Sequence, residues 1–467
     1  MRGTRVLVVG GGYAGMLVGR RLQRGRGIEL TLVNPENFMQ YQPFLPEAAA
    51  GNIEPRHVVV PLRQVLKKTR FVAGEVERLD HEDRKAVVRL ADGSTSELPY
   101  DVVVLTAGSR SRILPIPGLA EHGVGFKTLT EAIYLRNRVL SCLEVAAETS
   151  DPERRRALTF VFVGGGYAGV EAMAELEDMA RSAMRFYPML RPEDMRWAMV
   201  EAGPRILGEI GERLSAYATE RLRRRGIAVY VDTRLESAEG GVIRLSNGES
   251  FPADTLVWTT GVKAESLAAG SGLPVDAVGR LPVDEFLRVV GVEGMWACGD
   301  CAAVPDVRRG GINPPTAQHA LFQSRRLAKN LRRVLRGRSP KPFRHRNLGQ
   351  IASLGLYRGV ASPLGIRVRG FPAWFLHRTY HLLRMPTTSR KVRIVFDWTV
   401  GLFFPRDIVQ LGSLQHPREP FRRAVGGQPA DPRSPQQATP DAPAGSRQPM
   451  APDAPGREAG GESSSSE

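Results

Sequence analysis

Cysteine is scarce in this sequence: 467 residues contain only three, Cys142, Cys298 and Cys301. So few cysteines exclude a scaffold held together by disulfides and favour a reducing compartment. Long apolar runs are also missing, and none approaches the roughly 18 residues that a membrane-spanning helix needs. An apolar strand begins by about residue 5, which leaves no room for a signal peptide. With 42% hydrophobic residues, the chain is nevertheless expected to form two or three globular domains.

Acidic residues are missing from a long stretch of the C-terminal half. Residues 307–396 contain 20 Lys and Arg but no Asp or Glu, and the whole chain carries a net charge of +16. Such a block favours an anionic partner, either nucleic acid or a membrane surface, with a solvated basic face as the ordinary alternative. No nucleic-acid-binding motif accompanies the charge, so we expect no nucleic-acid partner. No cluster of His, Cys and acidic residues predicts a metal site.

Large apolar side chains are nearly absent after about residue 417. The stretch 417–467 is rich in Pro, Gly, Ser and Ala. Such a composition cannot bury enough apolar surface to offset the entropy lost on ordering. We therefore predict a disordered tail over 417–467.

Glycine is plentiful, and the hexapeptide GGGYAG occurs twice, at 10–15 and at 164–169. Each copy follows an apolar run typical of a β-strand and precedes a helical pattern. In a dinucleotide-binding turn, the first glycine allows the tight turn, the second admits the pyrophosphate, and the third lets the helix pack on the strand. The helix N-terminus then directs free N–H groups at the phosphates. The predicted contacts are Gly10, Gly11, Gly12, Tyr13, Ala14 and Gly15 at the first turn, and Gly164, Gly166 and Gly169 at the second.

A second motif repeats in the same order. Residues 91–108 and 246–261 each contain a turn, a short strand, an Asp, an apolar strand and then Thr-x-Gly. The chain therefore contains two related units, and we predict an α/β fold with two Rossmann-like dinucleotide-binding domains. Two such sites favour a flavin and a nicotinamide as the bound pair, because hydride moves between them. A decayed duplicate whose second site binds nothing is the alternative.

The residue that ends the second strand of each unit is the predicted contact to the adenosine ribose. In the second unit this residue is Glu201, whose carboxylate accepts from both ribose hydroxyls and repels a 2′-phosphate. We therefore expect NADH over NADPH. In the first unit it is Asn34, where an acid would be usual, although an amide can still bond to a ribose.

The segment GVEGMWACGDCAAVP leads an apolar strand into Gly299-Asp300. It resembles the second flavin fingerprint of two-dinucleotide flavoproteins, in which the Asp holds the ribitol chain of FAD. The resemblance implies an FAD domain that is interrupted by an NAD domain. The predicted parts are 1–155 and 266–330 for the FAD domain, 156–265 for the NAD domain, 331–416 for a basic and aromatic membrane-associating region, and 417–467 for the tail.

The chain from residue 1 to about 415 resembles the type II NADH:quinone oxidoreductases, which are single-subunit FAD enzymes on a membrane face. The resemblance rests on the glycine turns and on NPENFMQYQPFLPEAAAG, GGGYAGVEAMAEL, NPPTAQHALFQSRRLAKNL and VRIVFDWTVGLFFPRDIVQLG. It implies FAD at the first site, NADH at the second and a membrane quinone near Gln318 and Gln323. Further cofactor contacts are implied at Val76, Ala107, Gly108, Gly261, Gly299, Asp300, Ala317 and Gln318.

The implied reaction passes a hydride from NADH to the flavin and two electrons on to a membrane quinone, without proton pumping. Glu171 is the candidate catalytic acid, because a quinone takes up two protons and a buried carboxylate with a raised pKa can supply one. An acid that merely complements the dipole of its helix is the alternative. Phe322 stands where many relatives carry Gln, which leaves that quinone contact open. A soluble reductase of a protein or disulfide acceptor and a non-enzymatic NADH sensor are the other function classes.

Cys298 and Cys301 form a C-x-x-C pair around Gly299-Asp300, which raises disulfide chemistry as a further alternative. The pair straddles the Asp expected to hold the flavin instead of lying in the NAD domain. Small buried thiols are therefore the simpler expectation.

The segment 371–412 has two apolar aromatic stretches separated by basic residues. This composition favours helices that lie in a membrane interface, with anionic lipid as partner. Packing on the core or on a second subunit is the alternative, and we expect a homodimer through this region. The protein is thus expected to be peripheral, on the cytoplasmic face of the cell membrane. The predicted anchors are Trp374, Phe375, Tyr380, Trp398, Phe403 and Phe404.

Overall fold

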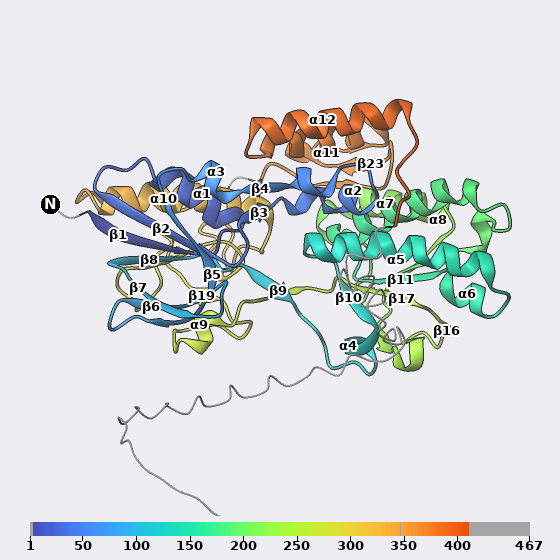
Figure 1. Cartoon of the computed structure of the whole chain (residues 1–467), viewed down its shortest axis with the longest axis horizontal. Coiled ribbons are helices and arrows are strands. Elements are labelled where there is room, and N and C mark those ends of the chain that lie inside the picture. The colour runs from blue at the N-terminus through green and yellow to red at the C-terminus, as the bar shows by residue number, and fades with distance from the viewer. Residues whose placement is uncertain (1–2, 346, 411–467) are drawn as a thin grey trace, which may run out of the picture. The chain divides into compact units, whose positions relative to one another are not determined.

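The computed structural model describes residues 3–345 and 347–410, so the tail predicted at 417–467 lies outside the described residues. Two sheets organise the described chain (Figure 1). The first sheet has the strand order β20 (Met295–Ala297), β8 (Val102–Leu105), β1 (Thr4–Val9), β2 (Ile28–Asn34), β5 (Arg70–Asp80), β6 (Lys85–Leu90) and β7 (Thr95–Pro99). The second has the order β10 (Gly123–Gly125), β17 (Thr255–Trp258), β11 (Thr159–Val163), β12 (Arg196–Val200) and β13 (Ile227–Tyr230).

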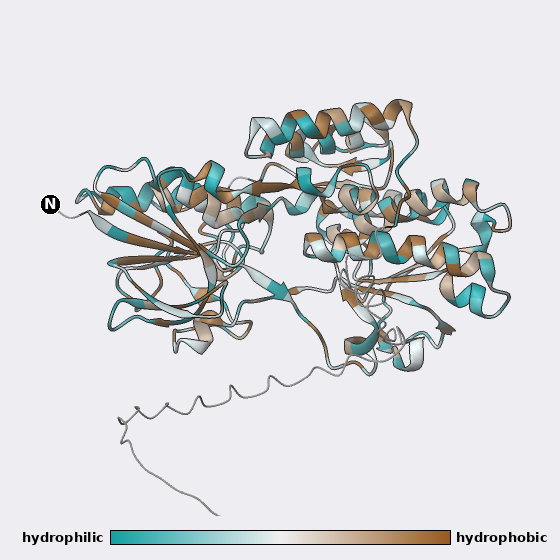
Figure 2. Cartoon of the chain, viewed as in Figure 1, coloured by the Kyte–Doolittle hydropathy of each residue, from teal (hydrophilic) through white to brown (hydrophobic). Residues whose placement is uncertain are grey.

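The two sheets are built to one plan. In each, the strand that enters the glycine turn, β1 or β11, lies between the next strand of its unit and the strand that ends at Thr-x-Gly. All of these pairs are parallel, and the strands are rich in buried Val, Leu and Phe (Figure 2). Such side chains suit a parallel sheet that is covered on both faces. The mixed α/β fold and the internal repeat are therefore confirmed.

Antiparallel strands close each unit. In the first unit these are β6 and β7, which continue the large sheet. In the second unit they form a separate sheet of β14 (Leu235–Ser237), β15 (Val242–Leu245) and β16 (Ser250–Pro252). The short pairs β3 (Phe38–Gln40) with β4 (Val59–Pro61) and β19 (Leu281–Pro282) with β21 (Ala302–Ala303) flank the first unit.

The chain passes twice between the two sheets. β9 (Ser109–Ser111) pairs antiparallel with β18 (Val262–Ala264), and these strands link the sheets (Figure 1). β20 then returns to pair with β8, so residues beyond the second unit complete the first sheet. The predicted boundary at 156 is wrong in one respect, because β10 pairs with β17 of the second sheet. Its sequence, Gly-Val-Gly, is too short and too poor in β-branched residues to indicate a strand.

Helices cover the sheets and connect the units. α1 (Tyr13–Leu22) packs on α10 (Ala317–Val334), while α5 (Leu129–Glu148) and α2 (Leu45–Ala49) contact α7 (Tyr167–Ala183). A capping box of Thr128 and Glu131 starts α5. The remaining helices of the two units are α3 (Leu62–Val65), α4 (Leu119–His122), α6 (Glu153–Ala157), α8 (Glu212–Arg223) and α9 (Leu267–Gly270).

A C-terminal layer lies above α2 and α7 (Figure 1). It consists of a small antiparallel sheet of β22 (Ile351–Ser353), β23 (Gly359–Ala361) and β24 (Val368–Arg369), followed by α11 (Phe371–Arg384) and α12 (Thr388–Phe403). α11 packs on this sheet and α12 packs on α11. Among the described residues, no helix combines the length and the apolar character needed to cross a bilayer.

Candidate active site

The first glycine of each turn has a backbone conformation that other residues rarely adopt. Gly10 has a φ of +94° and Gly164 a φ of +111°. A Cβ atom at Gly10 would lie 2.4 Å from the carbonyl oxygen of Thr106, and one at Gly164 would lie 2.7 Å from Oγ1 of Thr259. Both positions therefore require glycine.

The Thr-x-Gly motifs close onto these turns. The Thr106 hydroxyl donates to the carbonyl oxygen of Gly10 at 2.8 Å, and the Thr259 hydroxyl donates to that of Gly164 at 2.9 Å. The sequence repeat revealed both motifs but not this role of their threonines. Each hydroxyl fixes the first peptide of its glycine turn, so the two repeated motifs form one structural unit.

The second and third glycines behave differently. A Cβ at Gly15 would lie 1.8 Å from the carbonyl oxygen of Gly10, and one at Gly169 would lie 2.1 Å from that of Gly164. At Gly12 and Gly166, a Cβ would meet no atom within 4 Å. This open space lies at the N-termini of α1 and α7, whose free N–H groups favour phosphate. Both turns therefore fit the pyrophosphate of a dinucleotide.

The two strand-end residues occupy equivalent places. Asn34 accepts a hydrogen bond from the Gly11 N–H at 2.7 Å, and Glu201 accepts one from the Gly165 N–H at 2.6 Å. The second carboxylate oxygen of Glu201 accepts from the Gly203 N–H at 2.7 Å. The amide of Asn34 therefore replaces a carboxylate as the acceptor for its turn, while the second unit keeps a full negative charge there.

Gly299 and Asp300 follow β20 and lie beside the end of β8, as the flavin fingerprint predicted. Asp300 accepts a hydrogen bond from the Ser109 hydroxyl at 2.6 Å, and Lys127 Nζ donates to that hydroxyl at 2.5 Å. Burial lowers the pKa of Lys127, although Asp300 and nearby glutamates oppose this effect. The sequence did not indicate Ser109 or Lys127, because they come from the link between the units and not from a motif.

The two cysteines around Asp300 are buried free thiols. Burial raises the pKa of Cys298 well above its ordinary value and that of Cys301 to about 11. The Cys301 thiol donates to the carbonyl oxygen of Leu105 at 3.5 Å. Because a reactive cysteine needs a thiolate and access to solvent, these thiols favour a packing role.

α10 presents its two predicted glutamines differently. Gln323 is buried, and its Oε1 accepts a hydrogen bond from the Gly299 N–H at 2.8 Å. Gln323 therefore supports the turn that carries Asp300, and its quinone contact stays a prediction. Gln318, in the first turn of α10 beside Ala317, makes only long contacts of 3.3 and 3.4 Å with the backbone of Leu348 and Gly349.

The other predicted cofactor residues line the same edges of the sheets. Gly108 and Gly261 have positive φ values. Like the second glycines of the turns, they have open space at the Cβ position. Ala107 precedes Gly108 directly after β8. Val76 is buried in β5, where the ladder to β6 has an irregular register.

A cluster of buried carboxylates extends from the second turn along α7. Glu171 accepts a hydrogen bond from the Ser353 N–H at 2.9 Å. One turn further, Glu175 accepts from the Ser353 hydroxyl at 3.0 Å and from Asn52 Nδ2 at 2.8 Å. Burial and the neighbouring carboxylate of Glu47 raise the pKa of Glu175. The structure therefore favours more than a dipole-complementing role for Glu171, because its oxygen faces the C-terminal layer.

Two histidines of α11 connect this cluster to the first turn. His377 Nε2 lies 3.0 Å from Glu171 Oε1, which is the distance of an ion pair. The angle between the two groups does not allow a good hydrogen bond. Burial lowers the pKa of His377, but Glu171, Glu47 and Glu175 outweigh it and raise that pKa overall. The ring of His381 packs on His377, with 4.6 Å between centroids, and its Nδ1 lies 3.3 Å from the Tyr41 hydroxyl.

The path ends at the first glycine turn. The ring of Tyr41 contacts the ring of Tyr13 edge-on, with 5.8 Å between centroids. Burial raises the pKa of Tyr13 to about 12, so its hydroxyl keeps its proton at neutral pH. The sequence did not indicate Tyr41, His377 or His381, because they have no motif and meet only through the packing of α11.

Two predicted membrane anchors are corrected. Trp374 is buried, and Trp398 donates its indole N–H to the buried carboxylate of Glu47 at 2.8 Å. Arg378 Nη2 lies 2.8 Å from the same oxygen of Glu47. Their amphipathic rings suit an interface, but here the polar atoms of α11 and α12 pair with a charge from the first unit.

Comparison with known proteins agrees with this geometry. A family model described as pyridine nucleotide-disulphide oxidoreductase matches residues 4–324. The chain is 30% identical to a probable NADH dehydrogenase of Dictyostelium discoideum, over 81% of this chain and 85% of that protein. It is 28% identical to the type II NADH:quinone oxidoreductase Ndh of Mycobacterium tuberculosis, over 87% of this chain and 89% of that protein. Its fold is similar to that of NDH2 from Plasmodium falciparum in complex with NADH, with a TM-score of 0.82 and 16% identity over 87% of this chain and 100% of that chain.

Proposed function

Because the chain belongs to the pyridine nucleotide-disulphide oxidoreductases and, among them, to the type II NADH:quinone oxidoreductases, we propose that its first turn holds FAD and its second holds NADH. The protein is a flavoprotein that oxidises NADH and reduces a quinone. FAD, when bound, accepts a hydride from NADH and passes two electrons to the quinone. The observation that supports the assignment is the pairing of β20 with β8, which brings Asp300 to the first sheet, where it would accept from a ribitol chain.

The residues around the turns bind and orient the cofactors. Free N–H groups at Gly12 and Gly166 receive the two pyrophosphates. Glu201 accepts from the NADH ribose and disfavours a 2′-phosphate, whereas Asn34 accepts at the FAD ribose without adding charge. Lys127 places a cation behind Ser109 and Asp300.

The choice of acceptor is tested by steady-state kinetics of the purified protein with NADH. We expect turnover with a short-chain quinone and none with dithiol-forming disulfides or with ferredoxin. Turnover of a disulfide or a protein acceptor in place of the quinone would support the alternative reductase. The raised thiol pKa values of Cys298 and Cys301 weigh against disulfide chemistry.

We further propose that Glu171, His377, His381 and Tyr41 move protons to the quinone. A quinone needs two protons with its two electrons, and these residues form a line of titratable groups from α7 to the first turn. Glu171 and His377 lie 3.0 Å apart at the start of this line. Burial keeps the pKa of His381 well below its ordinary value, so its ring is neutral at rest and readily releases a proton that passes through it.

Ferricyanide separates proton delivery from electron transfer, because it takes up electrons without protons. In Glu171→Gln we expect quinone turnover to fall by about 100-fold, the order of general acid catalysis. Ferricyanide reduction by NADH should stay within about twofold, since neither turn changes. Equal losses with both acceptors would show that Glu171 supports the fold or the NADH site instead.

Attachment to a membrane surface is the remaining proposal. α12 has one buried residue, Ile394, and much of the exposed apolar surface of the described chain lies on α11, on α12 and just beyond it. The exposed large apolar residues there are Phe371, Phe375, Leu383, Val392, Val395, Phe396, Val400, Leu402, Phe403, Phe404 and Val409. Such a face, with basic residues beside it, favours an anionic bilayer on the cytoplasmic side.

Point substitutions test this face better than deletion, because deletion would also remove the partners of Glu171 and Glu47. Phe396→Ser/Phe403→Ser should float with anionic vesicles much less than the wild type. The control Phe186→Ser/Met189→Ser removes two exposed apolar side chains from the second unit and should float normally. If the first variant instead turns a dimer into a monomer and floats unchanged, the face is the expected homodimer interface.

A further inference from the structure

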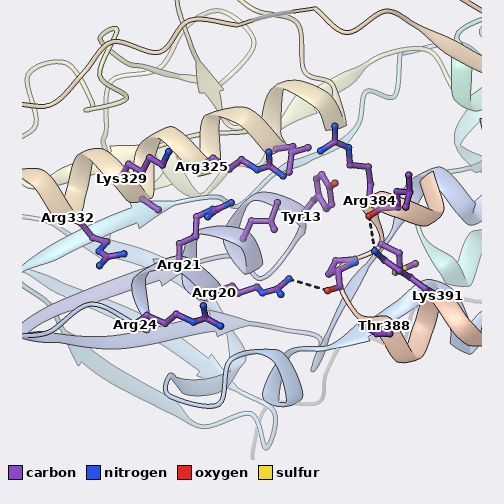
Figure 3. Close-up of a pocket in the computed structure, with 16 residues that line it drawn as sticks. Tyr13, Arg20, Arg21, Arg24, Arg325, Lys329, Arg332, Arg384, Thr388 and Lys391 are labelled. Atoms are coloured by element: carbon purple, nitrogen blue, oxygen red, sulfur yellow. Dashed lines mark hydrogen bonds between the residues drawn. The ribbon is translucent and has the colours of Figure 1, made fainter. Parts of the chain in front are cut away.

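A cationic cavity lies along α1 and reaches Tyr13 of the first glycine turn. It has a volume of about 630 Å³ and is bounded by α1, α10 and the junction of α11 with α12 (Figure 3). Eight of its lining residues are Arg or Lys and none is acidic: Arg20, Arg21, Arg24, Arg325, Lys329, Arg332, Arg384 and Lys391. Like charges gathered in this way repel one another unless an anion joins them.

The cations of this cavity lack protein counterions. In the described ranges 3–345 and 347–410, none of the eight forms an ion pair with a carboxylate. The buried Nε atoms of Arg21 and Arg325 have no hydrogen-bond partner at all. Arg20 and Lys391 donate to the backbone oxygens of Pro386 and Leu383, which fixes the junction above the cavity without neutralising charge. An unpaired buried donor of this kind is costly and therefore points to a ligand.

The spacing of the charges indicates a phosphate-bearing ligand. Arg325, Lys329 and Arg332 repeat at intervals of four and three residues, so they share one face of α10 over about 10 Å. Arg20 and Arg21 of α1, and Arg24 just beyond its end, face them (Figure 3). Guanidinium groups bind phosphate oxygens in pairs. A neutral quinone would leave all of these charges unpaired, which separates this cavity from the quinone site.

The lining of the cavity also contains apolar side chains, Leu17, Leu321, Leu383 and Met385. Leu383 is 67% exposed, on the same surface as the other exposed apolar residues of the C-terminal helices. A second cavity of about 550 Å³ shares Arg20 and Arg24 and adds further lysines without an acid. The ligand should therefore carry phosphate at one end and a hydrocarbon chain at the other.

We propose that this cavity binds the headgroup of an anionic phospholipid, with its acyl chains leaving past Leu383. The proposal rests on the proposed membrane attachment, which brings the lipid to this face. It differs from surface attraction because one lipid molecule occupies one built site. Bound in this way, the lipid also fixes the α11–α12 junction against α1.

A short-chain lipid in monomeric form tests the site apart from any membrane surface. We would titrate the full-length, FAD-loaded protein with dihexanoyl phosphatidylglycerol below its micelle concentration, by calorimetry. The wild type should bind one equivalent. Arg325→Gln/Lys329→Gln should bind at least about tenfold more weakly, since a hydrogen bond to a charged group contributes more than 1.4 kcal/mol. Flavin content and melting temperature check that this variant is folded.

Arg367→Gln/Arg393→Gln is the matched control, because it removes the same charge from exposed C-terminal residues outside the cavity. It should bind the monomeric lipid within about twofold of the wild type, since no headgroup contact changes. Equal weakening in both variants would overturn the site, as would wild-type protein that floats with vesicles but ignores the monomer. Tighter binding of inorganic pyrophosphate than of the lipid would overturn the choice of lipid. Failure to float at all would instead contradict the membrane proposal.

Discussion

Gly12 and Gly166 occupy equivalent open positions, and this equivalence allows each to serve as the control for the other. We expect Gly12→Val to yield folded protein without FAD, because the side chain meets no protein atom but fills the space of the pyrophosphate. Gly166→Val should retain FAD yet lose its reduction by NADH. Absorbance of the flavin and anaerobic NADH titration measure the two outcomes. Loss of FAD from both variants would contradict the separate assignment of the two turns.

Glu201 combines a structural and a selective role. Its carboxylate accepts the N–H groups of Gly165 and Gly203, and its charge opposes a 2′-phosphate. For Glu201→Gln we expect kcat/KM for NADH to fall by about tenfold and the preference for NADH over NADPH to narrow, because one charge-assisted contact is lost. Asn34→Asp, the converse change in the first unit, should leave this preference unaltered. An unchanged kcat/KM for both NADH and NADPH in Glu201→Gln would show that Glu201 does not contact the ribose.

Asp178 links stability to pH. Burial raises its pKa to about 6 although Arg225 lies 3.0 Å away and opposes the shift. The ordinary pKa in the unfolded chain is near 4. The folded state thus binds the proton more tightly, and stability should fall by roughly 3 kcal/mol as pH rises from about 4 to 6. Asp178→Asn should flatten the free energy of unfolding over this window, as measured by urea denaturation. If the free energy of unfolding of Asp178→Asn falls as steeply between about pH 4 and 6, another buried acid causes the pH dependence.

The sequence predicts the role of a residue when that role depends only on neighbouring residues in the chain. The glycines, Glu201 and Asn34 stand at fixed offsets from a strand and a helix, so the motif alone indicates them. Lys127 and His377 could not be predicted, because each acquires its role from a partner far away in the chain. The contact of Gln323 with Gly299 could not be predicted either, since helical spacing does not state which face of α10 turns inward.

At the scale of elements, α10 supports the flavin turn through one side chain. Gln323→Leu should leave the Gly299 N–H unsatisfied, at a cost of about 1–3 kcal/mol. We expect a lower melting temperature and faster loss of FAD on dilution. Gln318→Leu on the same helix is the control, because Gln318 makes only long contacts, and it should retain FAD normally. If Gln318→Leu instead loses FAD faster than Gln323→Leu, the result would favour a quinone contact for Gln323.

Some elements were predictable from the sequence and others were not. Strands such as β1 and β11 were predictable because continuous runs of Val, Leu and Phe favour a buried parallel strand. The inward packing of Trp374, which is buried, and of Trp398, which is partly buried, was not predictable, because aromatic residues favour a membrane interface and a core equally. Only the buried carboxylate of Glu47, which pairs with Arg378 of α11 and Trp398 of α12, distinguishes packing on the core from insertion into a membrane.

For the whole molecule, the interleaving of the units was predictable from the order of motifs, and it predicts an order of folding. All strands of the second sheet lie between Gly123 and Trp258, whereas Met295 must pair with Val103 to complete the first. Loop closure makes the distant pairing slower. In pulsed hydrogen exchange during refolding, amides of β11 and β12 should be protected before those of β8 and β20. Simultaneous protection would indicate that both sheets fold in one step.

The late return of β20 also matters for the chain as it leaves the ribosome. At typical rates of synthesis, the stretch between β8 and β20 takes on the order of 10–40 s to appear. During that time β8 is an open edge that can recruit strands from other chains. The nascent protein is thus able to assemble its NADH unit while the flavin site still lacks Asp300. We therefore expect FAD to bind late, after β20 has been synthesised. A shortage of flavin should then increase the fraction of incompletely folded, aggregation-prone molecules.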